Sequence, residues 1–295
     1  MEYVIGVDVG GTKILAGVVA RDGTIGKTVE VPTPTTSEAD LVSALEQEIA
    51  ELLDDRVAGL GFGLPSQIDQ RLGVAIGSVN IPLDHLPLRD HMQGRFGLST
   101  AIENDANAAT LAEFHSGAGR EARTMVMLTL GSGCGGGVVI DGELYRGWAE
   151  FGHMVIEYDG LPCQGTCTGR GHLEPYVTGF AATKLAQTAF GPAVDAHRLV
   201  RLANEGEARA VEILDGIGRR LGAGIGSLVN IFNPELVVIG GGFAAAGDFI
   251  LDPAREIVAR EGLAGAGKRV RIVRAELGTA AGLIGAGLVA FDALP

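Results

Sequence analysis

The sequence predicts a mixed α/β protein built from two related halves. Apolar stretches with the period of strands alternate along the chain with longer stretches that have the period of helices, as in α/β folds. A segment of the form strand, glycine-rich turn, strand occurs twice, once within residues 3–26 and once within residues 124–145. This internal similarity indicates two halves that face a common cleft.

Composition narrows the class of protein. A chain of 295 residues with 46% hydrophobic and 20% charged residues can bury a substantial core, which excludes a disordered protein. The net charge of −13 argues against nucleic acid as a partner, because binding its phosphates requires a basic face. We see no signal peptide and no apolar run of the ~18 residues that a membrane span needs, so we expect a cytoplasmic protein that binds no membrane.

The first half is expected to begin with a hairpin. YVIGVDVGGTKILAGVVARDGTIG predicts strand, turn and strand, followed by a turn at Asp22-Gly23. The segment VAGLGFGLP predicts a further strand, and STAIENDANAATLAEF predicts a strand to Glu103 and a helix from Asn104 or Asp105. Four apolar residues at helical spacing predict an amphipathic helix over residues 38–54: Leu41, Leu45, Ile49 and Leu52.

The second half repeats this logic. TMVMLTLGSGCGGGVVIDGELY predicts strand, glycine-rich turn and strand, with a hairpin turn at Asp141-Gly142. A long helix over residues 208–232 is followed by the strand LVVIGGG and a further helix. Residues 269–277 predict a last strand and residues 278–294 a last helix. We place the boundary between the halves near residues 115–122.

Three glycine-rich turns indicate a phosphate-bearing ligand. In DVGGTK, residues 8–13, a turn with two glycines exposes backbone N–H groups that suit phosphate oxygens. Asp8, at the end of a buried strand, can hold Mg2+ directly or through water. LGSGCGGG (130–137) and IGGG (239–242) are the other two turns, and neither fits the P-loop or the dinucleotide pattern. An ordinary hairpin explains any one of them, whereas three together favour a nucleotide.

The tripeptide END, residues 103–105, stands at a strand-to-helix junction. A carboxylate there can reach a substrate hydroxyl and accept its proton, which phosphoryl transfer to an alcohol requires. From the tripeptide alone, the better interpretation is that Asn104 or Asp105 caps the following helix.

Taken in order, the motifs resemble those of the ROK family (repressors, open reading frames, kinases) of sugar kinases, in the actin-like ATPase superfamily. DVGGTK resembles the family's first phosphate loop, GFGLPSQID its GxGxPGxxD segment and ENDANAA its catalytic segment. LGSGCGGG resembles the second phosphate loop, AEFGHM the sugar-binding and metal segment, and VVIGGG the adenosine segment. The resemblance covers nearly the whole chain.

This resemblance implies a fold of two actin-like (ribonuclease H-like) domains, with mixed sheets flanked by helices around a central cleft. The N-terminal domain is expected at residues 1–117, completed by the C-terminal helix 279–295. The C-terminal domain is expected at residues 118–278 and carries a zinc loop.

The resemblance also implies roles for individual residues. Asp105 is expected to be the general base for the primary hydroxyl of the sugar, and Asp8 to organise Mg2+. The other sugar contacts are expected from Asn104, Glu150, His153 and Glu174, with Gly63 and Asn80 as further cleft residues. The ATP contacts are expected from Gly10, Gly11, Thr12, Lys13, Gly131, Ser132, Gly133, Gly241 and Gly242.

The segment GHMVIEYDGLPCQGTCTGRGHLE, residues 152–174, departs from the family's zinc pattern of one histidine and three cysteines. Cys163 lies two places earlier than expected, and His172 replaces the last cysteine. His153, Cys163, Cys167 and His172 remain a suitable set for structural Zn2+, since Cys and His are both tetrahedral zinc ligands. A loop without metal is the alternative that stays open. A redox pair is not expected, because the spacing is not C-x-x-C. We expect Cys134 to be a small buried residue.

These residues imply ATP-dependent phosphorylation of a hexose at its 6-hydroxyl, with glucose as the expected substrate. Kinases for N-acetylmannosamine, N-acetylglucosamine, fructose or allose are alternatives, because one pocket substitution changes discrimination by only ~1–3 kcal/mol. A non-catalytic sugar-binding protein is the alternative from another class, and Asp105 with the three glycine turns argues against it. Polyphosphate is a further possible donor, which the acidic chain disfavours.

A sugar-sensing transcription regulator is not expected. Its DNA-binding segment would precede the first phosphate loop, and the strand leading to that loop starts within four residues of Met1. The resemblance implies a homodimer or a homotetramer.

Overall fold

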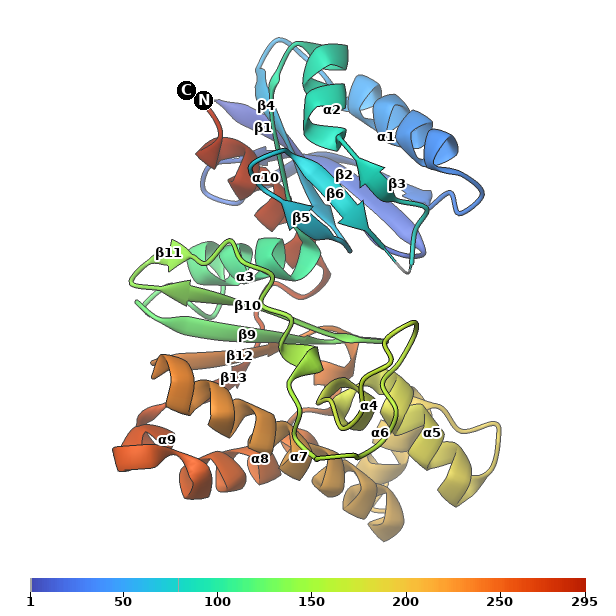
Figure 1. Ribbon diagram of the computed structural model, residues 1–295, viewed down its shortest axis with the longest axis vertical. Coiled ribbons are helices and arrows are strands. Elements are labelled where there is room, and N and C mark those ends of the chain that lie inside the picture. Colours follow the sequence, from blue (N-terminus) through green and yellow to red (C-terminus); the bar gives the residue numbers. More distant parts are fainter. Residues whose placement is uncertain (1, 79) are drawn as a thin grey trace. The chain divides into compact units, whose positions relative to one another are not determined.

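The computed structural model describes residues 2–78 and 80–295. The chain folds into two compact units. The first unit comprises the residues up to 120, residues 146–148 and residues 279–295, and the second comprises residues 121–145 and 149–278. Each unit is a mixed five-stranded sheet flanked by helices (Figure 1).

The sheet of the first unit has the strand order β3-β2-β1-β4-β8. β1, β4 and β8 are parallel, whereas β2 and β3 are antiparallel to their neighbours. Its strands are β1 (Tyr3–Val9), β2 (Lys13–Ala20), β3 (Ile25–Pro32), β4 (Val57–Leu64) and β8 (Ser99–Asn104). A second, antiparallel sheet follows β4 and contains β5 (Gln67–Asp69), β6 (Val74–Gly77) and β7 (Asp84–Leu86), which were not predicted from the sequence.

The helices of the first unit are α1 (Glu38–Leu52), α2 (Leu88–Phe96), α3 (Asp105–Ser116) and α10 (Ala281–Asp292). α1 begins as predicted, because the Ser37 hydroxyl accepts the N–H of Asp40. Its four apolar residues are buried as predicted, and the helix ends two residues early. The predicted last helix starts with a 3-10 turn, η4 (Gly278–Ala280), before α10.

α10 packs directly on the sheet of the first unit through glycine. A Cβ atom on Gly61 of β4 would overlap the carbonyl oxygen of Ala286 in α10. Only a residue without a side chain lets strand and helix backbones approach this closely. This close approach joins the C-terminal end of the chain to its first sheet (Figure 1).

The sheet of the second unit has the order β11-β10-β9-β12-β13 and repeats the pattern of the first sheet. Its strands are β9 (Met125–Leu130), β10 (Cys134–Ile140), β11 (Glu143–Leu144), β12 (Leu236–Gly240) and β13 (Arg271–Arg274). Asp141 and Gly142 have φ values of 51° and 91°, as the predicted two-residue hairpin turn requires. β13 is shorter than the predicted strand 269–277, because Arg269 ends the preceding helix α9.

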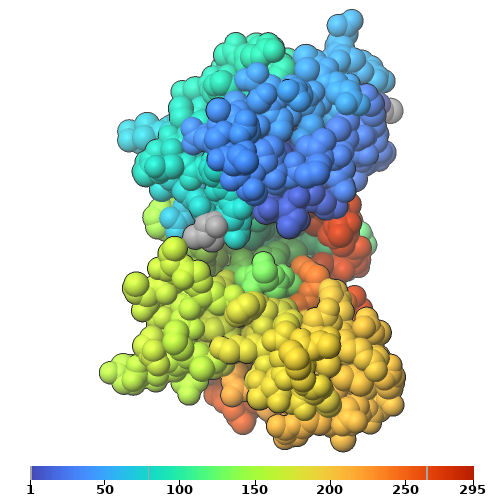
Figure 2. All heavy atoms as spheres, turned by 90° about the vertical axis from the view of Figure 1, so that its right-hand side faces the viewer, coloured from blue at the N-terminus to red at the C-terminus, as the bar shows by residue number. Residues whose placement is uncertain are grey.

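The core of the second unit is built largely by helices. α7 (Ala208–Phe232) has the predicted bounds and packs against α8 (Asp248–Glu261). Further helices are α4 (Glu174–Val177), α5 (Gly179–Phe190), α6 (Ala196–Asn204) and α9 (Ala266–Arg269), together with the 3-10 turns η1 (Phe151–His153), η2 (Gly242–Ala246) and η3 (Leu263–Gly265). Residues 155–170, yellow-green in Figure 2, form a surface loop.

Of the helices in residues 2–78 and 80–295, none combines the length and the apolar character that crossing a bilayer requires.

Candidate functional site

In the first unit, three parallel strands end side by side. The register pairs Asp8 of β1 with Gly63 of β4, and Gly63 with Glu103 of β8. Ligands of open α/β sheets bind outside the carboxyl ends of parallel strands. Asp8, Gly63 and the END segment therefore stand at one edge of the sheet, from three separate stretches of sequence.

Asp8 is a carboxylate in an unfavourable environment for charge. It lies against the N-terminal turn of α10, where a Cβ on Gly282 would overlap its carboxyl group. Burial raises the pKa of Asp8 to about 6, and the nearby charge of Lys13 lowers it in part. A cation bound beside Asp8 would favour its ionised form, so this position suits a divalent metal ion. Lys13 itself is exposed, and its Nζ lies 2.6 Å from Glu30.

The first glycine turn joins β1 to β2. The Gly10 N–H donates to the Lys13 carbonyl at 2.9 Å, and the Thr33 hydroxyl donates to the Gly10 carbonyl at 2.7 Å. Gly11 and Thr12 are exposed. Gly11 lies beside Asn80, whose Cβ is 3.4 Å from where a Cβ on Gly11 would stand. The structure thus brings these expected cofactor and substrate residues together.

The END segment combines a helix cap with the expected base. The Asn104 Oδ1 accepts the N–H groups of Ala106 and Asn107, so Asn104 caps α3. Its Nδ2 donates to the Ser66 carbonyl at 3.2 Å and retains a second hydrogen for another acceptor. Asp105 opens the helix, and its Oδ1 accepts the Ala106 N–H at 2.8 Å.

Sequence reasoning did not identify the environment of Glu103. This residue is buried. It accepts hydrogen bonds from Gln70 and Asn107 and forms an ion pair with Arg146. The charge of Glu103 within an apolar strand was the available signal. No pattern in the sequence pointed to Gln70 and Arg146 as its partners, because they lie 33 and 43 residues away from Glu103 in sequence.

In the second unit, glycine turns gather at the ends of β9 and β12. The Gly131 N–H donates to the Gly133 carbonyl, and Gly179 at the start of α5 donates to the Gly131 carbonyl, each at 2.9 Å. Gly241 has a φ of 81° and packs against the backbone of Leu130. Ser132 is exposed, and a Cβ on Gly242 would meet no atom within 4 Å among the described residues. Ser132, Gly241 and Gly242 are therefore the exposed residues of these turns.

Two carboxylates of the second unit lie near the start of β10. The Glu174 Oε2 accepts the Cys134 N–H at 2.8 Å. Glu150 directly precedes η1, whose Gly152 packs against the Cys134 carbonyl. Burial raises the pKa of the Cys134 thiol, and the charges of Glu174 and Glu150 raise it further. Cys134 is therefore a buried, protonated thiol and a poor nucleophile.

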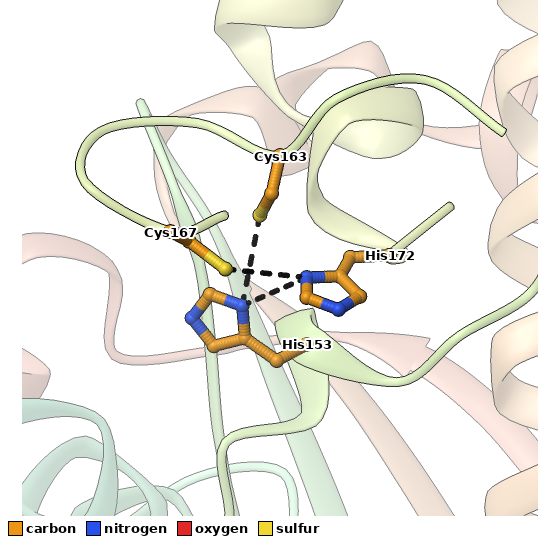
Figure 3. A group of neighbouring side chains, drawn as sticks. All are labelled: His153, Cys163, Cys167 and His172. Carbon is orange, nitrogen blue, oxygen red and sulfur yellow. Dashed lines mark hydrogen bonds between the residues drawn. The ribbon is translucent and has the colours of Figure 1, made fainter. Parts of the chain in front are cut away.

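Four side chains from η1 and the loop that follows it converge as a candidate metal centre (Figure 3). His153 comes from η1, and Cys163, Cys167 and His172 come from the loop that follows it. One donor atom of each residue lies within 4.8 Å of the others. The Nδ1 atoms of the two histidines are 3.2 Å apart. The Cys163 Sγ is 3.6 Å from the His153 Nδ1, and the Cys167 Sγ is 3.7 Å from the His172 Nδ1.

These separations fit a tetrahedral ion. Zinc bonds of about 2.0–2.1 Å to nitrogen and about 2.3 Å to sulfur give edges of roughly 3.3 Å between nitrogens and roughly 3.6 Å between nitrogen and sulfur. Burial raises the pKa of the Cys163 thiol to about 11, so without a metal ion the thiol is protonated. A bound cation would reverse that preference, because a coordinating thiol is deprotonated.

The expected site residues thus fall into two sets. The first unit holds Asp8, Gly10, Gly11, Thr12, Lys13, Gly63, Asn80, Asn104 and Asp105. The second unit holds Gly131, Ser132, Gly133, Glu150, His153, Cys163, Cys167, His172, Glu174, Gly241 and Gly242. Within each unit, residues far apart in sequence lie together at strand ends or in one loop.

Comparison with known proteins gives consistent similarities. The sequence profile of the ROK family matches residues 4–293. The chain is 35% identical to a glucokinase of Streptomyces coelicolor, over 97% of this chain and 96% of that protein. It is 36% identical to a glucokinase of Thermotoga maritima, over 86% of each chain. Among solved structures, a ROK family glucokinase from Streptomyces griseus in complex with glucose and AMPPNP matches with a TM-score of 0.84 and 34% identity, covering 98% of this chain and 99% of that one.

Proposed function

The chain belongs to the ROK family, and from this premise we propose that it is an ATP-dependent hexose kinase that phosphorylates glucose at its 6-hydroxyl. Glucokinases are similar to this chain over almost its whole length, and one of them was solved with glucose and an ATP analogue. The observation that carries the proposal is the position of Asp105. It opens α3 at the carboxyl end of β8, in the strand edge that also carries Asp8.

In the proposed mechanism, Asp105 accepts the proton of the sugar 6-hydroxyl as that oxygen attacks the γ-phosphate of ATP. A positioned base of this kind contributes on the order of 10²- to 10⁴-fold to the rate. Asn104 keeps one amide hydrogen for a sugar oxygen while it caps α3. Positioning and charge neutralisation supply most of the remaining rate enhancement in phosphoryl transfer.

The second unit is proposed to supply further contacts for both substrates. Glu150, His153 and Glu174 are proposed to bind sugar hydroxyls, each of which offers one donor and two acceptor positions. The glycine turns at residues 10–12, 131–133 and 241–242 are proposed to contact ATP. The Gly10 and Gly131 N–H groups bond within their own turns, so the proposed phosphate contacts come from the other backbone N–H groups, which suit phosphate oxygens without any net positive charge. This explains how a chain with a net charge of −13 can bind a nucleotide.

Asp8 is the proposed carboxylate for Mg2+. Its pKa is raised because the buried carboxylate charge is only partly balanced by Lys13. A bound divalent cation would balance the rest of that charge. Bound Mg2+ would neutralise charge on the ATP phosphates.

We further propose a structural Zn2+ at His153, Cys163, Cys167 and His172. The donor types and their separations support this assignment. The second ring nitrogen of His153 points away from the cluster in Figure 3, so the metal can orient that nitrogen for a sugar hydroxyl. We expect mass spectrometry to find about one zinc ion per purified chain. The variant His172→Cys should retain this ion, and the double variant Cys163→Ser/Cys167→Ser should lose it.

Assembly and location complete the proposal. Ile231 and Leu263 are large apolar side chains that stay largely exposed, and the Asn230 side chain beside Ile231 accepts the N–H of Leu263 at 2.8 Å. Such exposed apolar surface supports a homodimer or homotetramer, which light scattering measures directly. Three free cysteines and the use of ATP support a cytoplasmic location.

The decisive experiment measures ADP release from purified, zinc-replete protein with Mg-ATP and a panel of sugars. The panel contains glucose, mannose, fructose, allose, N-acetylglucosamine and N-acetylmannosamine, and a parallel series replaces ATP with polyphosphate. We expect turnover with glucose and its loss in Asp105→Asn. Turnover with another sugar or another phosphoryl donor would replace glucose or ATP as the proposed substrate. If calorimetry detects sugar binding but no combination of sugar and donor gives turnover, the protein is a sugar-binding protein and not a kinase.

A further inference from the structure

Glu103 is a buried carboxylate directly before the proposed catalytic residues. Its side chain is only 1% exposed, so each of its oxygens must find partners within the protein. Oε1 accepts the Asn104 N–H and the Asn107 Nδ2, both at 3.0 Å. Oε2 accepts the Gln70 Nε2 at 2.9 Å and lies 3.3 Å from the Arg146 Nη1.

The Glu103 contacts fix the residues on both sides of Asp105. Asn104 caps α3, and Asn107 lies in the same first turn. The amide of Asn107 also donates to the Gly147 carbonyl at 3.2 Å. Both partners of this amide are acceptors, so its nitrogen must face them. The turn that carries Asp105 is therefore held through Glu103.

Arg146 is the cationic partner of Glu103 and belongs to an unusual segment. Residues 146–148 group with the first unit, although their neighbours in sequence belong to the second. The guanidinium group also pairs with Asp292 of α10, at 2.8 Å. Arg146, Gln70 and Asp292 line a pocket of about 320 Å³ within the first unit. The head group of Arg146 can therefore be reached by a small solute.

We propose that Arg146 is a positioning residue for phosphoryl transfer. Through Glu103 it holds the first turn of α3, and with it the carboxylate of Asp105, in the orientation that accepts the substrate proton. Removing the cation leaves a buried carboxylate without its charge partner, which favours rearrangement of the side chains around it. Small displacements of a reacting group can cost on the order of 10²-fold in rate. The inference rests on the proposed kinase function.

The first test is Arg146→Ala with chemical rescue. We expect kcat for glucose phosphorylation to fall by about 10- to 100-fold. The KM for glucose should change much less, because Arg146 is not proposed to contact sugar. Guanidinium ion at millimolar concentration should restore part of kcat, since the pocket gives it access to the position of the lost head group. Urea, which has a similar shape and no charge, should not.

The second test removes the need for the cation. In Glu103→Gln/Arg146→Ala the neutral amide requires no charge partner, so kcat should exceed that of Arg146→Ala several-fold. Asp292→Asn is a matched control, because it removes the other carboxylate of Arg146 and leaves Glu103 paired. Arg123→Ala removes an exposed ion pair with Asp141 in the second unit and should leave kcat unchanged.

Two kinetic results would overturn the inference. One is a kcat of Arg146→Ala within about twofold of the unchanged protein. The other is a loss of kcat in parallel with the melting temperature that neither guanidinium nor the Glu103→Gln exchange reverses, since Arg146 would then be structural only.

Hydrogen exchange tests the positioning without any activity. Exchange in the peptide of residues 99–107 should accelerate in Arg146→Ala and slow again when guanidinium is added. If the unchanged protein phosphorylates no sugar, the proposed function fails, and this exchange measurement still decides the role of Arg146. Equal exchange in both proteins overturns the inference.

Discussion

The two five-stranded sheets share one strand order, yet the two units differ in where they hold their polar side chains. Among the described residues, eight of the nine buried polar residues belong to the first unit and only Thr178 to the second. Those of the first unit are Thr33, Glu48, Ser66, Thr100, Glu103, Asn107, Thr110 and Glu113. In contrast, the histidines and cysteines of the second unit's candidate metal centre lie in η1 and in the loop after it, and their side chains are exposed or half-buried.

This difference suggests two ways of positioning reactive groups. A buried polar group must be matched with partners as the chain folds, so the interior of the first unit orients the END segment by itself. The loop of the second unit is held by backbone hydrogen bonds, such as that from the Cys163 N–H to the Gly169 carbonyl at 3.0 Å, and a metal ion would add a further link. The predictions below test whether the two units respond differently to changes of each kind.

The largest effect is expected from the pair Asp105→Asn and Glu174→Gln. The first variant should lower kcat on the order of 10³-fold, because the base is lost while sugar binding persists. The second should mainly raise the KM for glucose, by roughly tenfold, as expected for one weakened hydrogen bond. Steady-state kinetics separates the two. The contrast between the units fails if both variants lose kcat equally.

A packing change in the first unit should come next. Gly61→Ala places a methyl group into the backbone of α10 and should lower the free energy of unfolding by about 3 kcal/mol. Denaturant titration measures this loss. Gly94→Ala in α2 is the matched control, since no atom lies within 4 Å of the added methyl among the described residues. It should raise stability by about 0.5–1 kcal/mol, and equal effects of the two changes would contradict the close approach.

The buried Glu48 should make stability depend on pH. Its side-chain oxygens have no hydrogen-bond partner among the described residues, and burial raises its pKa from 4.5 to about 7. The folded state therefore binds a proton more tightly than the unfolded state, so this group's contribution is full below pH 4.5 and is lost as pH rises through about 7. The loss should reach up to about 3 kcal/mol.

Glu48→Gln should flatten this pH dependence between about pH 4.5 and about pH 8 when unfolding is followed in urea. Glu212→Gln replaces an exposed carboxylate of the second unit and should leave the dependence as it is. If the pH dependence of stability persists in Glu48→Gln, another titratable group causes it.

The smallest effect is expected from metal removal. Chelation should raise the KM for glucose by roughly tenfold, because His153 loses its orientation, while kcat changes little. In thermal unfolding, the melting temperature of the second unit should fall and that of the first unit should stay unchanged. Kinetics before and after zinc is restored measures this. A fall in kcat with an unchanged KM would contradict the division of roles between the units.

Local features of the fold could be predicted from sequence with good accuracy. The strand-turn-strand openings, the helix from residue 38 and the helix 208–232 follow from apolar periodicity and turn residues. The resemblance to the ROK family led to the cluster of His153, Cys163, Cys167 and His172, whose donor atoms converge. The helices between residues 174 and 204 and the small sheet β5-β6-β7 were not predicted. α4 and the three strands are at most four residues long, whereas α5 and α6 carry a helical pattern that the sequence analysis did not use.

The sequence by itself determined the strand-turn-strand openings, the helices 38–52 and 208–232 and the identity of the chemical groups, because periodicity and glycine content act over a few residues. Tertiary structure alone decided which distant residues meet. Arg146 pairs with Glu103 across 43 residues, and Glu48 occupies an interior position within an otherwise amphipathic helix. Both depend on how elements pack after they form, since long-range contacts and burial are properties of the assembled core and not of any local pattern.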